Sequence, residues 1–193
     1  MFILLNAFMK MKKAKGSVSI KLVLILVGLV PLVLAVSAIT FVSSKIVVEN
    51  LETSIRDELV VASRGLKEFY ENRIKISYGR FPPYDAAYVD SMKAAGVDLT
   101  LFKDNVSYIT SITDEKGVRI ENTKVSDAIW NIVKEDKDYY ADSVKINGIN
   151  YYVYYMPLKY GTKVVGMAFS GKPATIIQEA AISILKNIGI ISV

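Results

Sequence analysis

The side chains of this sequence that could do chemistry are tyrosines, arginines and lysines, because the chain contains neither Cys nor His. Without those two residue types, thiolate nucleophiles, Ser-His-Asp triads and the usual zinc sites are excluded. Ser170-Gly171-Lys172 lacks the preceding spacing of a phosphate-binding loop. The acidic residues are scattered and form no recognisable acid–base pair. The sequence therefore predicts no catalytic residue, no metal site, no cofactor and no enzyme activity.

Tyrosine is the most abundant of the groups suited to binding a small polar molecule. All 12 tyrosines follow residue 69. Each combines apolar area with one hydroxyl that donates or accepts a hydrogen bond. Arginine can bind a carboxylate through two parallel hydrogen bonds, and lysine supplies a point charge. Alternating tyrosines in strands also serve packing and cross-strand pairing, so both interpretations stay open.

The first element that positions these residues is a long amphipathic helix, predicted at 45–79 from apolar residues at three- and four-residue steps. Phe81-Pro82-Pro83-Tyr84 ends it, and a short helix is expected at 86–95. The stripe either packs only on the domain's own sheet or also binds a second subunit. Its residues are Val48, Leu51, Ile55, Leu59, Ala62, Leu66, Phe69 and Ile76, with an interruption at Arg73.

After Gly96 the hydrophobic period becomes two, which predicts β-strands. Asn147-Gly148 is the strongest hairpin signal, and Ser126 is expected to cap a short helix at 127–134. A long helix followed by antiparallel strands predicts an α+β domain with a PAS-like sheet. Five strands are expected, at 97–103, 106–113, 139–146, 150–158 and 163–170, and 119–122 is expected to be short and extended.

The N-terminal part is predicted to contain a transmembrane helix at 22–44, a run of 23 residues without charge. At ~1.5 Å per residue this run crosses roughly 30 Å of hydrocarbon, and Pro31 is expected to kink it. Lysines are the only charged residues in 1–21, and no acidic residue precedes Glu49. The N-terminal tail is therefore expected in the cytoplasm.

The same lysines supply much of the net charge of +5, which therefore indicates a membrane flank rather than a nucleic-acid site. Two alternatives to the anchor stay open. Ala35-Val36-Ser37-Ala38 resembles a signal-peptide cleavage site, although the apolar run is long for a signal peptide. Lys15-Gly16 before an apolar helix resembles the start of a type IV pilin.

At the C-terminal end, Thr175-Ile176-Ile177-Gln178 fits a capping box after Pro173, which predicts a helix. The residues that follow are largely apolar, and only Lys186 is charged after Glu179. We expect 174–193 to be the start of a second transmembrane helix that is cut short. An amphipathic helix packed on the domain is the alternative.

The segments Gly96–Phe102, Tyr108–Ile112, Gly117–Arg119, Asn122–Ser126, Asp138–Tyr140, Ile146–Gly148, Tyr151–Leu158 and Val165–Pro173 carry a family resemblance by their order and spacing. With the preceding helices, they resemble the single-Cache sensor domains of bacterial methyl-accepting chemotaxis proteins. The resemblance covers about residues 15–193 and implies that 45–173 form an extracytoplasmic single-Cache sensor domain.

The function that this resemblance implies is the ligand-sensing input region of a transmembrane chemoreceptor, here without the cytoplasmic signalling part. A sensor region of a histidine kinase or of a cyclic-dinucleotide enzyme is one alternative. A stand-alone membrane-anchored binding or pilin-like protein is another. The expected partners are a small-molecule ligand such as a small carboxylate, the membrane, and a second copy of the chain in a homodimer, without nucleic acid.

The resemblance also implies a small-molecule pocket between the sheet and the segment that precedes it. Tyr108 and Thr110 are expected to share a face of the second strand. Tyr152 and Tyr154 are expected to share a face of the fourth. Arg80 or Arg119 would bind a carboxylate bidentately and Lys172 would add a point charge. The predicted ligand-binding residues are thus Arg80, Tyr108, Thr110, Arg119, Tyr152, Tyr154 and Lys172.

Overall fold

The computed structural model of the chain describes residues 20–175, 179 and 182–183. The chain divides into two compact units, Met1–Lys45 and Ile46–Val193. Helix α2 (Ile20–Ile76) contributes to both units and continues through Pro31. The predicted basic tail at 1–21 and the predicted second membrane helix at 174–193 lie almost entirely outside the described residues, so both stay predictions.

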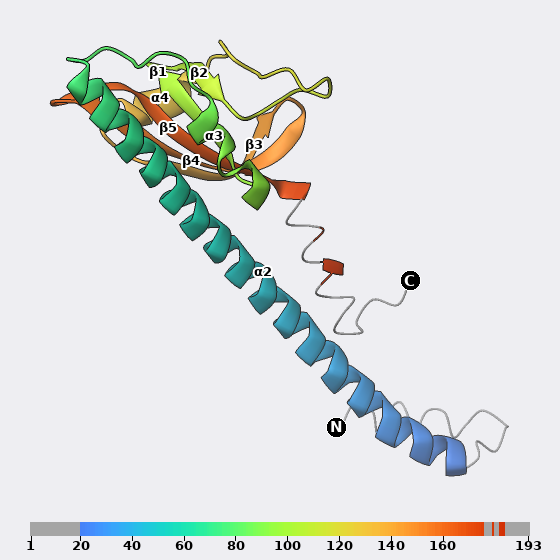
Figure 1. Cartoon of the computed structure of the whole chain (residues 1–193). Coiled ribbons are helices and arrows are strands. Elements are labelled where there is room, and N and C mark those ends of the chain that lie inside the picture. The colour runs from blue at the N-terminus through green and yellow to red at the C-terminus, as the bar shows by residue number, and fades with distance from the viewer. Residues whose placement is uncertain (1–19, 176–178, 180–181, 184–193) are drawn as a thin grey trace. The chain divides into compact units, whose positions relative to one another are not determined.

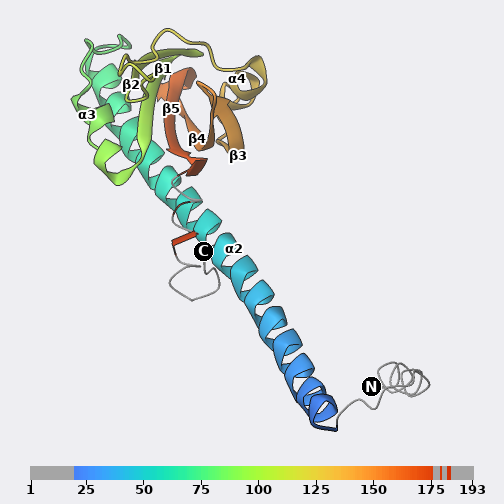
Figure 2. The same cartoon turned by 90° about the vertical axis from the view of Figure 1, so that its right-hand side faces the viewer.

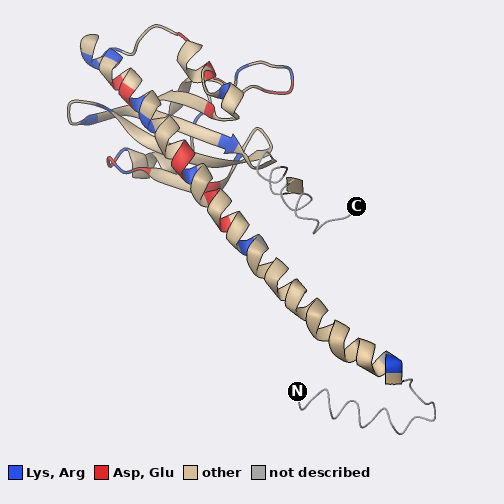
Figure 3. Ribbon diagram, turned by 60° about the horizontal axis from the view of Figure 1, so that its bottom comes forward, with Lys and Arg blue, Asp and Glu red and all other residues tan. Residues whose placement is uncertain are grey.

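The first unit, where it is described, is the N-terminal part of α2. Between Lys21 and Lys45 this part carries no charge, as the uniform colour of the ribbon shows (Figure 3). Its most apolar 18-residue window has a mean hydropathy of 2.7. Among the described residues, α2 is the one helix that is long and apolar enough to cross a membrane.

The second unit is built on one five-stranded sheet with the strand order β2-β1-β5-β4-β3 (Figure 1). All neighbouring strands are antiparallel, which confirms the α+β architecture predicted from the sequence. The strands are β1 (Asp98–Lys103), β2 (Val106–Thr110), β3 (Tyr139–Ile146), β4 (Ile149–Tyr160) and β5 (Lys163–Pro173). The central strand, β5, follows the other four strands in the sequence and pairs with both β1 and β4. The sheet is therefore complete only when β5 has taken its place between them.

One face of the sheet is covered by α2, whose buried residues recur at three- and four-residue steps: Ile55, Leu59, Ala62, Leu66, Tyr70 and Ile74. They pack with apolar residues of β1, β2, β4 and β5 in one continuous core. The predicted stripe is therefore wrong at its end, because Tyr70 and Ile74 are buried whereas Ile76 is 70% exposed. Both sets of steps fit a period of 3.6 residues, and only packing against the sheet selects one.

The opposite face carries a second core around Phe102, Tyr155 and Phe169, covered in part by α4 (Asp127–Val133). Figure 2 shows α4 on the side of the sheet away from α2 and α3. Ser126 caps α4 as predicted, since its Oγ accepts a hydrogen bond from the Ile129 amide at 3.4 Å.

The segment between α2 and the sheet forms two short helices where the sequence predicts one at 86–95. They are α3 (Ala87–Asp90) and the 3₁₀ helix η1 (Lys93–Ala95). Val89 of α3 is fully buried in the core on the α2 face. The Tyr88 ring stacks on Phe69 of α2 with 4.2 Å between ring centroids, so α3 is fixed against the long helix.

Candidate ligand-binding site

A cavity of about 310 Å³ lies on the face of the sheet that α2 leaves uncovered. Aromatic side chains of β1, β4 and β5 form its floor. Its wall consists of hydroxyl residues of β1 and β2, residues between 120 and 126, Ile129 of α4 and residues 144–147. A volume near 300 Å³ is at the lower end of the range for small-molecule pockets. This cavity lies between the sheet and the segment after β2, whereas the sequence predicts a pocket between the sheet and the segment before β1, which stays a prediction.

The apolar part of the floor consists of the aromatic side chains of Phe102, Tyr155 and Phe169. The rings of Tyr155 and Phe169 have centroids 4.9 Å apart, and Phe102 and Tyr155 are at 6.0 Å. All three side chains are more than nine-tenths buried. These rings give the cavity a rigid apolar base on which a small carbon skeleton can pack.

Hydroxyl groups form the polar part of the wall. The Oγ1 atoms of Thr100 and Thr110 are 2.6 Å apart, and the Ile112 amide donates to Thr110 Oγ1 at 3.1 Å. The Thr123 amide donates to Ser107 Oγ at 3.0 Å. Thr100 Oγ1 and Thr123 Oγ1, which lies 3.0 Å from Ser107 Oγ, each have one hydrogen-bond partner, so both keep capacity to bind a ligand.

Tyr155 adds a hydroxyl that has no hydrogen-bond partner in the described part of the chain, although the residue is only 3% exposed. No fully enclosed side-chain oxygen or nitrogen among the described residues is unpaired, so this hydroxyl keeps access to open space. Burial raises the pKa of Tyr155 well above its ordinary value. The group is therefore protonated at neutral pH and can donate to a ligand.

The electrostatic character of the cavity comes from Lys124 and Lys145. Both line it, and no Asp or Glu is among its lining residues. Neither ammonium group forms an ion pair within residues 20–175. Two uncompensated positive charges on a partly apolar cavity favour an anion over a cation.

Thr110 is the one predicted ligand-binding residue that lines this cavity. Tyr108 does not share its face, contrary to prediction. The register slips from Leu101↔Ile109 to Phe102↔Ser107, which leaves Tyr108 as the extra residue of a β-bulge. Tyr108 packs in the core on the α2 face, and its hydroxyl donates to the Pro82 carbonyl at 3.1 Å.

Tyr152 and Tyr154 do share a face of β4, as predicted, and that face is the one that α2 covers. The Tyr154 hydroxyl donates to Asp138 Oδ2 at 2.9 Å, and burial together with this bond raises the pKa of Tyr154 to about 12. Lys172 Nζ donates to Glu58 Oε2 of α2 at 2.6 Å. Lys172 therefore bonds the helix, the two tyrosines pack in the core on the α2 face, and none of the three lines the cavity.

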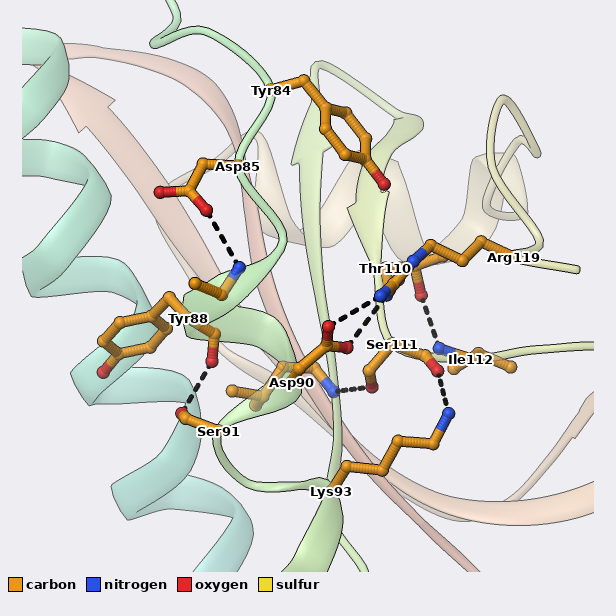
Figure 4. Close-up of polar contacts among 12 residues, drawn as sticks. Tyr84, Asp85, Tyr88, Asp90, Ser91, Lys93, Thr110, Ser111, Ile112 and Arg119 are labelled. Carbon is orange, nitrogen blue, oxygen red and sulfur yellow. Dashed lines mark hydrogen bonds and ion pairs between the residues drawn. The ribbon is translucent and has the colours of Figure 1, made fainter. Parts of the chain in front are cut away.

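The two predicted arginines differ in their surroundings. Arg80 is exposed, it does not line the cavity, and its side chain forms no hydrogen bond or ion pair with the described residues. Arg119 donates from Nη1 and Nη2 to both carboxylate oxygens of Asp90, at 2.9 and 2.6 Å (Figure 4). This bond holds the pKa of Asp90 below its usual value. A guanidinium paired in this way is not available to clamp a carboxylate ligand.

Sequence reasoning missed Thr100, Ser107, Tyr155, Lys124 and Lys145. Thr100 and Ser107 left a local signal, since each is a polar residue inside a predicted strand and each is about 2% exposed. No local signal marks the two lysines. They lie 21 residues apart in the sequence, and only folding brings them to one cavity.

A five-stranded antiparallel sheet with a long helix on one face and a cavity on the other is a PAS-like sensor fold. The family model for single Cache domain 3 matches residues 83–183, just over half of the chain. The chain belongs to this family.

Among solved structures, the chain is similar to the ligand-binding domain of the Pseudomonas aeruginosa PAO1 amino acid chemoreceptor PctC in complex with GABA. The identity is 11%, the TM-score is 0.38, and the match covers 72% of this chain and 67% of that one. A likeness at this level carries no argument about ligand or mechanism. No curated protein matches the chain.

Proposed function

We propose that the second unit is the ligand-sensing input domain of a transmembrane chemoreceptor, and that the ligand is a small organic anion such as a carboxylate. The observation that carries this proposal is the 310 Å³ cavity, which has no acidic lining residue and two lysines that form no ion pair within the part of the chain that the structure describes. An aromatic floor suits the carbon skeleton of such a ligand. The ammonium groups and the hydroxyls of Thr100 and Tyr155 suit its carboxylate.

The proposed topology places residues 1–21 in the cytoplasm, 22–44 in the membrane and 45–173 outside. The excess of lysine before the apolar run supports this orientation by the positive-inside rule. We further propose a homodimer, a signalling role in chemotaxis and no enzyme activity of this region. A histidine kinase or cyclic-dinucleotide output remains the second candidate, and the coding sequence downstream of Val193 distinguishes the two.

Strand β5 is suited to pass a signal from the cavity. Its residue Phe169 lines the cavity, whereas its neighbour Ser170 donates a hydrogen bond to the Leu59 carbonyl of α2 at 2.7 Å. A ligand that binds one position of β5 more tightly shifts the population toward that position, by no more than its difference in affinity.

The test is thermal unfolding of the full chain in lipid nanodiscs with acetate, succinate or citrate. Acetamide and succinamide serve as uncharged counterparts of the first two. A ligand at 100 times its Kd stabilises the folded state by about 2.7 kcal/mol, which raises the unfolding temperature. We expect a rise with at least one carboxylate and none with its amide.

The double variant Lys124→Gln/Lys145→Gln should abolish that rise. Lys116→Gln/Lys163→Gln, which removes two exposed lysines outside the cavity, is the matched control and should keep it. Stabilisation by the amides, by an amine such as ethanolamine, or by none of the probes would overturn the proposal of an anion sensor.

A further inference from the structure

Arg119 connects two parts of the domain that are far apart in sequence. Its Nη1 and Nη2 atoms donate to the two carboxylate oxygens of Asp90, 29 residues earlier, and Nη1 also donates to the Thr110 carbonyl (Figure 4). A bidentate guanidinium–carboxylate pair fixes orientation as well as distance. The guanidinium is therefore held between α3 on one side and β2 on the other.

On the cavity side, this contact reaches two residues of the wall. Thr110 lines the cavity with its side chain while its carbonyl accepts from Arg119. Ile120, the next residue after Arg119, also lines the cavity, and its amide donates to the Ile112 carbonyl at 3.0 Å. A shift of the guanidinium therefore displaces the wall at two points.

On the helix side, Asp90 is the last residue of α3, which is packed closely on α2. The neighbouring Val89 is fully buried, and Tyr88 stacks on Phe69 of α2. A Cβ atom at Gly65 of α2 would lie 2.8 Å from the Tyr88 hydroxyl, so α2 and α3 have no space between them at this point. A shift of Asp90 is therefore transmitted to this contact.

An ion pair on a protein surface often contributes little, and the Arg119 and Asp90 side chains are 30% and 40% exposed. Two features distinguish this pair from an ordinary surface pair. Its geometry is bidentate, and the same guanidinium donates a third hydrogen bond to the carbonyl of a cavity residue. The role of this pair therefore concerns position more than net stability.

We propose that Arg119 is a positioning residue that couples the cavity wall at Thr110 and Ile120 to the packing of α3 on α2. Arg119 does not itself bind the ligand. The consequence for ligand binding rests on the proposed sensor function, whereas the coupling is a property of the empty protein and can be measured without any ligand.

The experiment is hydrogen–deuterium exchange with mass spectrometry on the full chain in nanodiscs. It compares the wild type with Asp90→Asn, Arg119→Gln and the double variant. Asp90→Asn should speed amide exchange in residues 119–125, and Arg119→Gln should speed it in 87–96. Couplings along such networks correspond to increases of roughly 2- to 30-fold. Amide exchange in the double variant should be faster than in either single variant by no more than a small factor, because each substitution removes the same connection.

The control pair is Asp136→Asn and Lys159→Met. It breaks the ion pair between Lys159 and Asp136, whose side chains are comparably exposed at 34% and 49%. These variants should leave the amide exchange rates of residues 87–96 and 119–125 unchanged. Protection of the β3–β4 hairpin in every variant shows that the domain is folded. Arg119→Lys, which keeps the charge but loses the bidentate geometry, should restore the coupling only in part.

The proposal is overturned if Asp90→Asn speeds exchange in 87–96 alone, or if the two substitutions act additively while the hairpin stays protected. A second arm adds acetate, succinate or citrate. A probe that binds should slow amide exchange in both 87–96 and 119–125 of the wild type. In Arg119→Gln it should slow exchange in 119–125 alone. If no probe binds any variant, the sensor function fails while the exchange data still decide the coupling.

Discussion

Ser63 of α2 and Ser170 of β5 lie with their hydroxyl oxygens 2.8 Å apart, and both side chains are fully buried. Ser170 Oγ also lies 2.7 Å from the Leu59 carbonyl oxygen, and Ser63 Oγ lies 3.2 Å from that of Tyr154. Two hydroxyl protons thus serve three short contacts. The distances favour donation from Ser170 to Leu59 and from Ser63 to Ser170. This pair fixes the position of α2 along the sheet.

The first prediction concerns this pair. Ser170→Ala should lower the free energy of unfolding by about 1–2 kcal/mol, because it removes a buried donor and leaves Ser63 with only the longer contact. Ser63→Ala should have a similar effect, and the double variant should cost less than the sum. Denaturant titration in micelles measures this. The control is Ser91→Ala, whose exposed hydroxyl bonds the Tyr88 carbonyl and should matter by less than about 0.5 kcal/mol.

The second prediction concerns Gly166 of β5, which pairs with Lys103 of β1. A Cβ atom there would overlap the carbonyl oxygen of Phe102 on the neighbouring strand, and backbone cannot rotate away as a side chain does. Gly166→Ala should therefore destabilise the domain by at least about 1–3 kcal/mol and weaken the pairing of β1 with β5. Exchange of the β1 amides measures the effect. Gly28→Ala, where a Cβ meets nothing within 4 Å, is the control, and equal effects at both positions would contradict this explanation.

The third prediction concerns alkaline pH. Burial, and then the Asp85 carboxylate, raise the pKa of Tyr70 from 10.0 to about 12. A raised pKa in the folded state means that stability is fully present below pH 10 and is lost as the pH rises through 12. Tyr70→Phe should lose less stability over this interval than the wild type. Tyr78→Phe, at a residue that is 88% exposed, is the control and should follow the wild-type curve.

The fourth prediction concerns Thr100, which lines the cavity and whose hydroxyl has one hydrogen-bond partner, Thr110 Oγ1. Thr100→Val keeps the shape of the side chain and should weaken binding of an active carboxylate by roughly tenfold, the effect of one lost hydrogen bond. Calorimetric titration measures the affinity. Thr53→Val on α2, where the hydroxyl bonds the Glu49 carbonyl at 2.9 Å, is the control. Unchanged affinity in Thr100→Val would exclude that hydroxyl from the ligand site.

The sequence alone determined the elements of this protein, because their signals are local. Two-residue periodicity located all five strands, and β3 begins and ends at the predicted residues. Asn147 and Gly148 both adopt positive φ, at 47° and 83°, as the predicted hairpin turn requires. Ser126 caps its helix, and the uncharged run at 22–44 lies inside α2. Each of these features depends on residues a few positions apart.

The tertiary structure alone decided which side chains meet. One extra residue at Tyr108 reverses the face on which Thr110 lies, and no periodicity marks that bulge. Arg119 has the side chain expected of an anion clamp, yet Asp90, 29 residues away, occupies it. The cavity lies on the face that α2 leaves open, a choice made by packing rather than by pattern. Side chains on both faces alternate with the same period, so the sequence located the strands but could not tell which face would hold the cavity.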